Sequence, residues 1–167
     1  MDTERVVEDT AVNLLKLAVI RLPSDVKDAL QRAYKEETSE AGKVQLEAIL
    51  KDIELAEKDN TPLCQDTGIM IFYVKAGSKA PNLDKIETAL QNAAKRATKE
   101  IPLRPNAVDP FTQKNSGDNT GRHIPYINWE ITQGNTIEIT AFPKGGGSEN
   151  TCAIGMLTPG EGVKGLK

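Results

Sequence analysis

The chain has 167 residues, of which 27% are charged and 38% are apolar, and its formal net charge is −3. That length suits one domain with its own core, and the composition is typical of a globular protein. No stretch approaches the roughly 18 consecutive apolar residues of a membrane span, and no basic stripe interleaved with aromatic residues predicts nucleic-acid binding. The charged opening predicts no signal peptide, and two cysteines without framework spacing predict a reducing, cytoplasmic compartment.

Three helical patterns fill residues 1–60. Pro23 ends the first, Ser24 is a suitable N-cap for the second, and Thr38-Ser39 precede the third. We expect the apolar stripe of each helix to pack in the core. The stripes are Val7, Ala11, Leu14, Leu15, Ala18 and Leu22, then Val26, Ala29, Leu30, Ala33 and Tyr34, then Leu46, Ile49, Leu50, Ile53 and Ala56.

A strand and a fourth helix come next. Residues 69–74 form a continuous apolar run between Gly68 and Gly77, which predicts a strand covered on both faces. The helical pattern that follows the strand ends at Pro102. Residues 127–132 and 137–141 then alternate apolar and polar side chains around a turn, which predicts an antiparallel hairpin with one buried face.

These elements mix helices and strands without a regular βαβ repeat, which predicts the α+β class. We expect N-terminal helices over residues 1–60, followed over residues 61–167 by a small mixed or antiparallel sheet with packed helices. Both portions would belong to one domain, residues 1–167.

Three polar loops lie at the ends of the predicted strands, over residues 62–68, 104–121 and 144–150, and they would converge if the strands share a sheet. In the first loop, Cys64 could serve as a soft metal ligand or as a nucleophile. The adjoining Gln65 and Asp66 could bind or protonate a polar substrate. One cysteine cannot hold a metal cluster, so we expect Cys64 to act together with groups from another polypeptide segment.

The other two loops carry groups suited to anions, and each group has a plainer interpretation. Arg104 stands beside Pro105, where a rigid guanidinium could bind a carboxylate, although most arginines are solvated surface. Gly145–Gly147 could offer backbone N–H groups or form a flexible turn. The only histidine, His123, leaves open a nucleophile pair with Cys64 that Asp66 orients. Cys152 is expected to be a buried, inert thiol.

Four motifs together resemble one family, the iron–sulfur hydro-lyases of the class I fumarase and L(+)-tartrate dehydratase type. The resemblance covers nearly the whole chain and corresponds to the N-terminal part of the family's alpha subunit. The motifs occur in the family's order and are Pro62-Leu63-Cys64-Gln65-Asp66-Thr67-Gly68, Leu103-Arg104-Pro105, Gly117-Asp118-Asn119-Thr120 and Lys144-Gly145-Gly146-Gly147-Ser148-Glu149-Asn150.

The resemblance implies roles for individual residues. Cys64 matches the first of three cysteine ligands of a 4Fe-4S cluster, and Cys152 matches no ligand. Gln65 and Asp66 match residues of the family's substrate pocket. Of the residues in this chain, Asp66 is the one expected to be catalytic. Arg104 matches a contact to a substrate carboxylate, and Gly147 matches a backbone contact to the substrate.

The same resemblance implies partners. This chain matches only one of the family's three cluster thiolates, and it does not match the segment that carries the family's catalytic base. The remainder of the alpha subunit and a beta subunit or domain would complete an oligomeric enzyme, and the isolated chain would be inactive. The expected activity is hydration of fumarate to L-malate in the tricarboxylic acid cycle. The alternatives are an L(+)-tartrate dehydratase alpha subunit, a non-catalytic folding or assembly fragment, or a cysteine-nucleophile enzyme.

Overall fold

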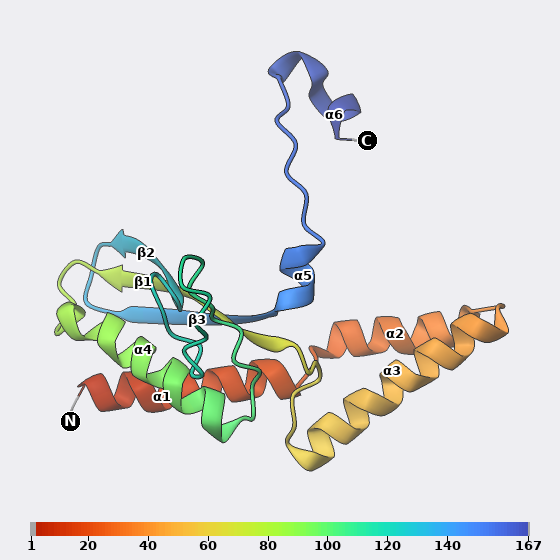
Figure 1. The fold of residues 1–167 in the computed structure, drawn as a ribbon, viewed down its shortest axis with the longest axis horizontal. Helices are drawn as coiled ribbons and strands as arrows, with labels where there is room; N and C mark the ends of the chain where they lie inside the picture. The colour runs from red at the N-terminus through yellow and green to blue at the C-terminus, as the bar shows by residue number, and fades with distance from the viewer. Residues whose placement is uncertain (1–2, 167) are drawn as a thin grey trace.

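Two helices cover one face of a three-stranded sheet in the computed structural model, which describes residues 3–166 except the side chains of residues 148 and 149 (Figure 1). The elements in chain order are α1 (Thr3–Ile20), α2 (Ser24–Glu36), α3 (Glu40–Asp59), β1 (Thr67–Gly77), α4 (Leu83–Glu100), β2 (Tyr126–Thr132), β3 (Ile137–Gly145), α5 (Gly146–Asn150), the 3-10 turn η1 (Pro159–Glu161) and α6 (Gly162–Gly165). Helices followed by a small mixed sheet confirm the α+β class.

The strand order is β2-β1-β3, with β1 parallel to β2 and antiparallel to β3. The predicted hairpin is therefore wrong, because β1 lies between the two strands that were expected to pair. The connection from β2 to β3 passes around the end of β1, where the Gly77 N–H donates to the Thr136 carbonyl at 2.8 Å. A side chain at position 77 would lie 2.3 Å from the Gly134 carbonyl oxygen, so glycine permits this close crossing.

The core lies between the sheet and the helices α1 and α4. Alternate β1 residues point inward, and Met70 and Phe72 are fully buried against the helices. In α1 the predicted residues Val7, Ala11 and Leu15 are buried as expected, whereas Ala18 is exposed. The buried face of α4 is rich in alanine, which lets this helix pack closely against α1.

Two packing predictions are wrong in the described structure. β1 is covered on one face only, and the side chain of Tyr73 on the other face is 52% exposed. The helix α2 buries none of its residues, and α3 buries only Ile53 and Ala56. The reason is that α2 and α3 pack mainly on each other, and they project as a pair away from the sheet (Figure 1).

Residues 151–166 form an arm that leaves the body of the molecule after α5 (Figure 1). Every residue of the arm is exposed. Cys152 stands at its start with an exposed thiol, so the expectation of a buried cysteine is wrong. Across residues 3–166, no helix combines the length and the apolar character that crossing a bilayer requires.

Candidate active site

The carboxylate of Asp66 is the point at which the three polar loops meet. Asp66 precedes β1, and its Oδ1 accepts a hydrogen bond from Nη1 of Arg104. Its Oδ2 accepts a hydrogen bond of 2.6 Å from the N–H of Gly147, at the start of α5. The structure thus brings together three of the residues that the sequence singled out, one from each loop.

Close packing of the backbone holds Arg104 beside the start of β1. The N–H of Arg104 donates to the carbonyl of Thr67 at 3.0 Å. A side chain at position 68 would lie 1.9 Å from the carbonyl oxygen of Arg104, so only glycine admits this approach. The Asn106 amide donates to the carbonyl of Asp66 at 2.7 Å and ties the two segments together from the other side.

Sequence reasoning assigned no role to Asn119, which fixes the Arg104 segment from beneath. Asn119 is fully buried, and its amide nitrogen donates to the Arg104 carbonyl at 3.0 Å and to Thr98 Oγ1 at 3.1 Å. Its carbonyl oxygen accepts from the Asn106 N–H at 2.7 Å. Its backbone is left-handed, with φ of 57°, a conformation that asparagine tolerates better than most residues. The only available signal was its place in the Gly117-Asp118-Asn119-Thr120 motif.

Asp66 is held in its ionised form. The Gly147 N–H is the largest influence that lowers the pKa of Asp66 below its ordinary value, and the Arg104 guanidinium lowers it further. Arg104 has capacity for another acceptor, because a guanidinium carries five N–H donors and 63% of this side chain is exposed. The pair therefore presents an ordered cation and an ordered anion to the solvent.

Asp66 lies between two open hollows. The first, of about 420 Å³, is bordered by Asp66, Ile69 and Arg104, and also by Gly146 and Gly147. The second, of about 640 Å³, is bordered by Cys64, Gln65 and Asp66 together with Pro102 and part of α3. The thiol of Cys64 is exposed, and Gln65 is exposed beside it. The structure thus places the predicted metal ligand and the predicted substrate contacts on adjoining surfaces.

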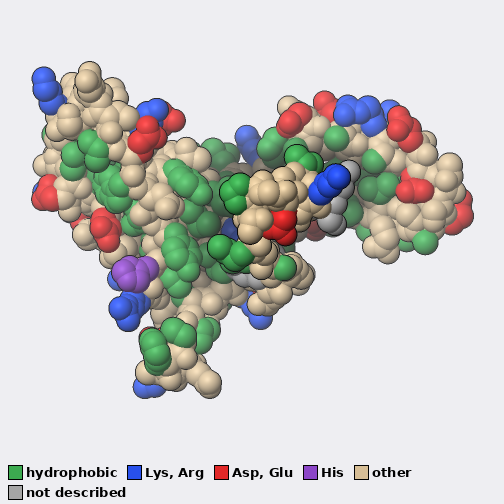
Figure 2. Space-filling view, turned by 90° about the horizontal axis from the view of Figure 1, so that it is seen from above, with side chains coloured by type: hydrophobic (Ala, Val, Ile, Leu, Met, Phe, Trp, Pro, Cys, Tyr) green, Lys and Arg blue, Asp and Glu red, His purple; other side chains and the backbone are tan. Residues whose placement is uncertain are grey.

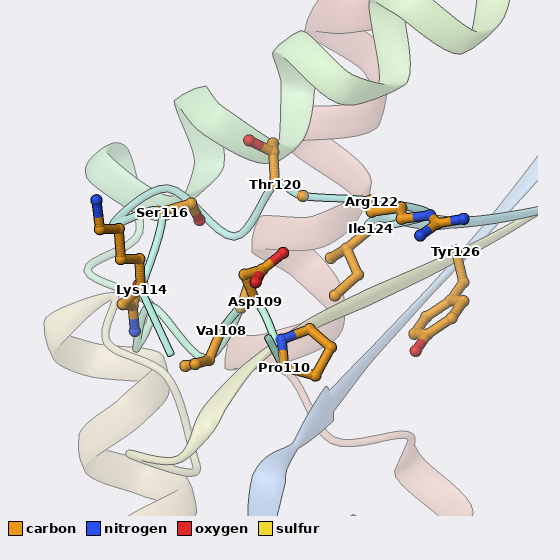
Figure 3. A pocket seen from close by; sticks show the side chains of 12 residues that line it. Val108, Asp109, Pro110, Lys114, Ser116, Thr120, Arg122, Ile124 and Tyr126 are labelled. Carbon is orange, nitrogen blue, oxygen red and sulfur yellow. The ribbon is translucent and has the colours of Figure 1, made fainter. Parts of the chain in front are cut away.

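A third hollow, of about 420 Å³, lies under the loop that connects α4 to β2. Figure 3 shows Asp109 and Ile124 projecting toward each other across it. The Asp109 carboxylate forms hydrogen bonds within its own turn. The N–H and the hydroxyl of Thr112 donate to its Oδ1, and these bonds lower the pKa of Asp109. Val108 and Asn115 border both this hollow and the first hollow beside Asp66.

Comparison with known proteins assigns the chain to a family. The family model described as fumarate hydratase (Fumerase) matches residues 8–167. The chain belongs to the fumarate hydratase (Fumerase) family. It is 45% identical over 165 residues to "Putative L(+)-tartrate dehydratase subunit alpha" of Methanocaldococcus jannaschii, an alignment that covers 96% of this chain and 58% of that protein.

Relatives in bacteria bear a related name. The chain is 36% identical over 159 residues to "L(+)-tartrate dehydratase subunit alpha" of Escherichia coli (strain K12), which covers 95% of this chain and 52% of that protein. The same values hold for the protein of that name in Shigella sonnei (strain Ss046). The chain thus spans about half the length of the curated relatives that it matches.

Within this member of the fumarate hydratase family, the described part of the chain does not build a complete metal site around Cys64. Among the side chains that the structure describes, which leave out those of residues 148 and 149, no group of three or more His, Cys, Asp or Glu could hold a metal ion. His123 borders a separate hollow beside Glu87 and Gln91 of α4, so the structure does not support a nucleophile pair between His123 and Cys64. An exposed cysteine at the edge of an open hollow fits one thiolate of a shared iron–sulfur site.

Proposed function

We propose that this chain is one component of an iron–sulfur-dependent hydro-lyase that acts on a C4 dicarboxylate, with fumarate and L-malate as the first choice of substrate pair. The observation that carries the proposal is the meeting of Asp66, Arg104 and Gly147 beside an open hollow, in a chain of the fumarate hydratase family. A guanidinium that has further N–H donors is suited to bind a substrate carboxylate.

Each residue has a part in this chemistry. Arg104 binds a substrate carboxylate and stabilises the negative charge that spreads into that group during the reaction. Gly147 and Gly146 border the hollow, and their backbone N–H groups both donate to Asp66, so they fix the carboxylate that faces the substrate. Asp66 is ionised, so it orients Arg104 and accepts a hydrogen bond from a substrate hydroxyl at its carboxylate oxygens. Gln65 supplies a neutral amide that can donate to the substrate and accept from it.

Cys64, in its thiolate form, would ligate one iron of a 4Fe-4S cluster. When it is bound, the cluster supplies a Lewis acid for the substrate oxygen. The other two thiolates would come from the remainder of an alpha subunit, and the base that removes the proton from carbon would come from a beta subunit or domain. These partners make an oligomer, and the 167 residues act in it as one domain. We expect no nucleic-acid or membrane partner.

A second substrate has a specific observation in its favour. The relatives reported above are named as L(+)-tartrate dehydratase alpha subunits. L(+)-tartrate is also a C4 dicarboxylate with a hydroxyl beside a carboxylate, so the same residues could bind it. If fumarate is the substrate, the enzyme would take a place in the tricarboxylic acid cycle. The two exposed cysteines, which form no disulfide with each other, favour a reducing, cytoplasmic location.

The test compares the two cysteines in the complete alpha–beta assembly. Cys64→Ala should remove iron and sulfide from the protein and abolish turnover of both fumarate and L(+)-tartrate. Cys152→Ala, a matched loss of an exposed thiol, should leave both measurements unchanged. The wild-type substrate preference then separates the two candidates. A metal-free assembly with full activity would refute the proposal, as would turnover by the isolated chain after iron reconstitution.

A further inference from the structure

We propose that the uncovered face of the sheet is a docking surface. Its occupant is the segment of an alpha-type chain that has no counterpart among these 167 residues. The identity of this partner rests on the proposed function. We call this surface the outer face, because α1 and α4 cover the opposite one. From the strand register, the outer face comprises Ile71, Tyr73 and Lys75 of β1, Tyr126, Asn128 and Glu130 of β2, and Glu138, Thr140 and Phe142 of β3.

The outer face is apolar at one end and charged at the other. Ile71 of the central strand lies between Tyr126 and Phe142, which are 48% and 53% exposed. The next β1 residue on this face is Tyr73, which is half exposed. Figure 2 shows hydrophobic side chains gathered over the sheet on the face that it presents. A sheet face that contacts water carries mainly polar side chains, so these aromatic residues indicate a surface that a partner covers.

The charged end of the outer face carries an ion pair of its own. Lys75 lies between Glu130 and Glu138, and its Nζ is 3.9 Å from Glu130 Oε1. Between the two ends, Tyr73 has Asn128 and Thr140 as neighbours. Polarity therefore increases with distance from Asp66. A partner needs to cover only the end of the face that adjoins the candidate active site.

That apolar end is continuous with the candidate active site. Ile69 lies on the same side of β1 as Ile71, and it also borders the hollow beside Asp66. Tyr126 borders the third hollow, which shares Val108 with the hollow beside Asp66. A polypeptide seated on the outer face would thus form a wall of the substrate hollow. The surface to be covered and the site to be completed are neighbours.

The length of the relatives favours an alpha-type segment as the occupant. In those relatives 58% and 52% of a single alpha chain match this chain, so 42% and 48% of it lie outside the match. The arm at residues 151–166 is also exposed and carries apolar side chains, with Ile154 at 95% and Met156 at 92% exposure. A second copy of this chain would cover the aromatic residues, but it would bring only another Cys64 and not the two further ligands that the cluster requires.

Hydroxyl-radical footprinting read by mass spectrometry tests this assignment at individual side chains. The probe is a chimera in which these 167 residues replace the matched portion of the Methanocaldococcus jannaschii protein, compared with the 167-residue chain alone. We expect the reactivity of Tyr73, Tyr126 and Phe142 to fall at least ten-fold in the chimera. Tyr34 on α2 should keep its reactivity, and the fully buried Phe72 should stay unreactive in both proteins.

A matched pair of variants adds a second measurement. Phe142→Lys in the chimera should restore the reactivity of Tyr73 and Tyr126, whereas Val44→Lys, at an exposed apolar position on α3, should not. Equal reactivity of the three aromatic residues in chain and chimera would overturn the proposal. Protection in the chain alone that rises with its concentration would assign the face to a second copy and also overturn it. Protection in the chimera, together with full activity of a complete alpha–beta assembly that contains no iron, would uphold the docking surface and reject the cluster role of Cys64.

Discussion

Replacing Asn119 by alanine tests whether this buried amide holds the Arg104 segment in place. Three hydrogen bonds are lost, to Thr98, Arg104 and Asn106, at about 1 kcal/mol each. Alanine at a φ of 57° costs about 1 kcal/mol more, because its Cβ is crowded in the left-handed conformation. We therefore expect the free energy of unfolding to fall by about 4 kcal/mol, a large part of the stability of a typical domain.

Urea unfolding of the chain measures this loss, with Asn60→Ala as the matched control. Asn60 has nearly the same backbone conformation, with φ of 55°, but it is exposed at the end of α3. The control should lose only the strain contribution of about 1 kcal/mol. With an m-value of about 2 kcal/mol/M, the midpoint falls by about 2 M for Asn119→Ala and by about 0.5 M for Asn60→Ala. Equal shifts would show that Asn119 contributes backbone conformation alone and would refute its role beneath Arg104.

Two further predictions concern Asp66 and Gly68. Gly68→Ala should destabilise the chain by about 1–3 kcal/mol in the same assay, because its Cβ would overlap the Arg104 carbonyl. Gly121→Ala has open space and should be neutral, so similar losses in both variants would contradict the close approach. The pKa of Asp66 in the folded chain lies below its ordinary value of 3.8, so in acid the unfolded chain binds more protons at this residue than the folded chain. The ionised carboxylate therefore contributes its full stabilisation above pH 3.8. That stabilisation is lost as the pH falls through the lowered pKa. The difference in unfolding free energy between wild type and Asp66→Asn should therefore shrink in acid, and a difference independent of pH would contradict this assignment.

The helices and strands were easier to predict from the sequence than the way in which they pack against one another. The helical stripe that contains Ala11 and Leu15, and the run around Phe72, follow from local periodicity and were correctly identified. The hairpin was wrong because two alternating strands near a turn pair equally well with each other or with a strand inserted between them, and sequence spacing does not distinguish these outcomes. Tyr73 was expected to be covered because a continuous apolar run records hydrophobicity, but not what lies above it.

The candidate site was predictable in part for a similar reason. Asp66, Arg104 and Gly147 were singled out individually, since their loops combine polar chemistry with glycine and proline. That Arg104 pairs with Asp66 was not foreseen, because residues 38 positions apart in the chain meet only through the packing of β1. Asn119 was missed because its role depends on burial, which no local pattern reports.

The sequence by itself determined the α+β class, most helix and strand positions and the motifs that indicate a fumarate hydratase relative, because these depend on residues close together in the chain. Only the tertiary structure decided that β1 lies between β2 and β3, that an aromatic sheet face is left open beside the site, and that Asn119 supports Arg104. These features depend on contacts between distant segments. Their free energies come from packing and hydrogen bonds that form only when the whole chain has folded.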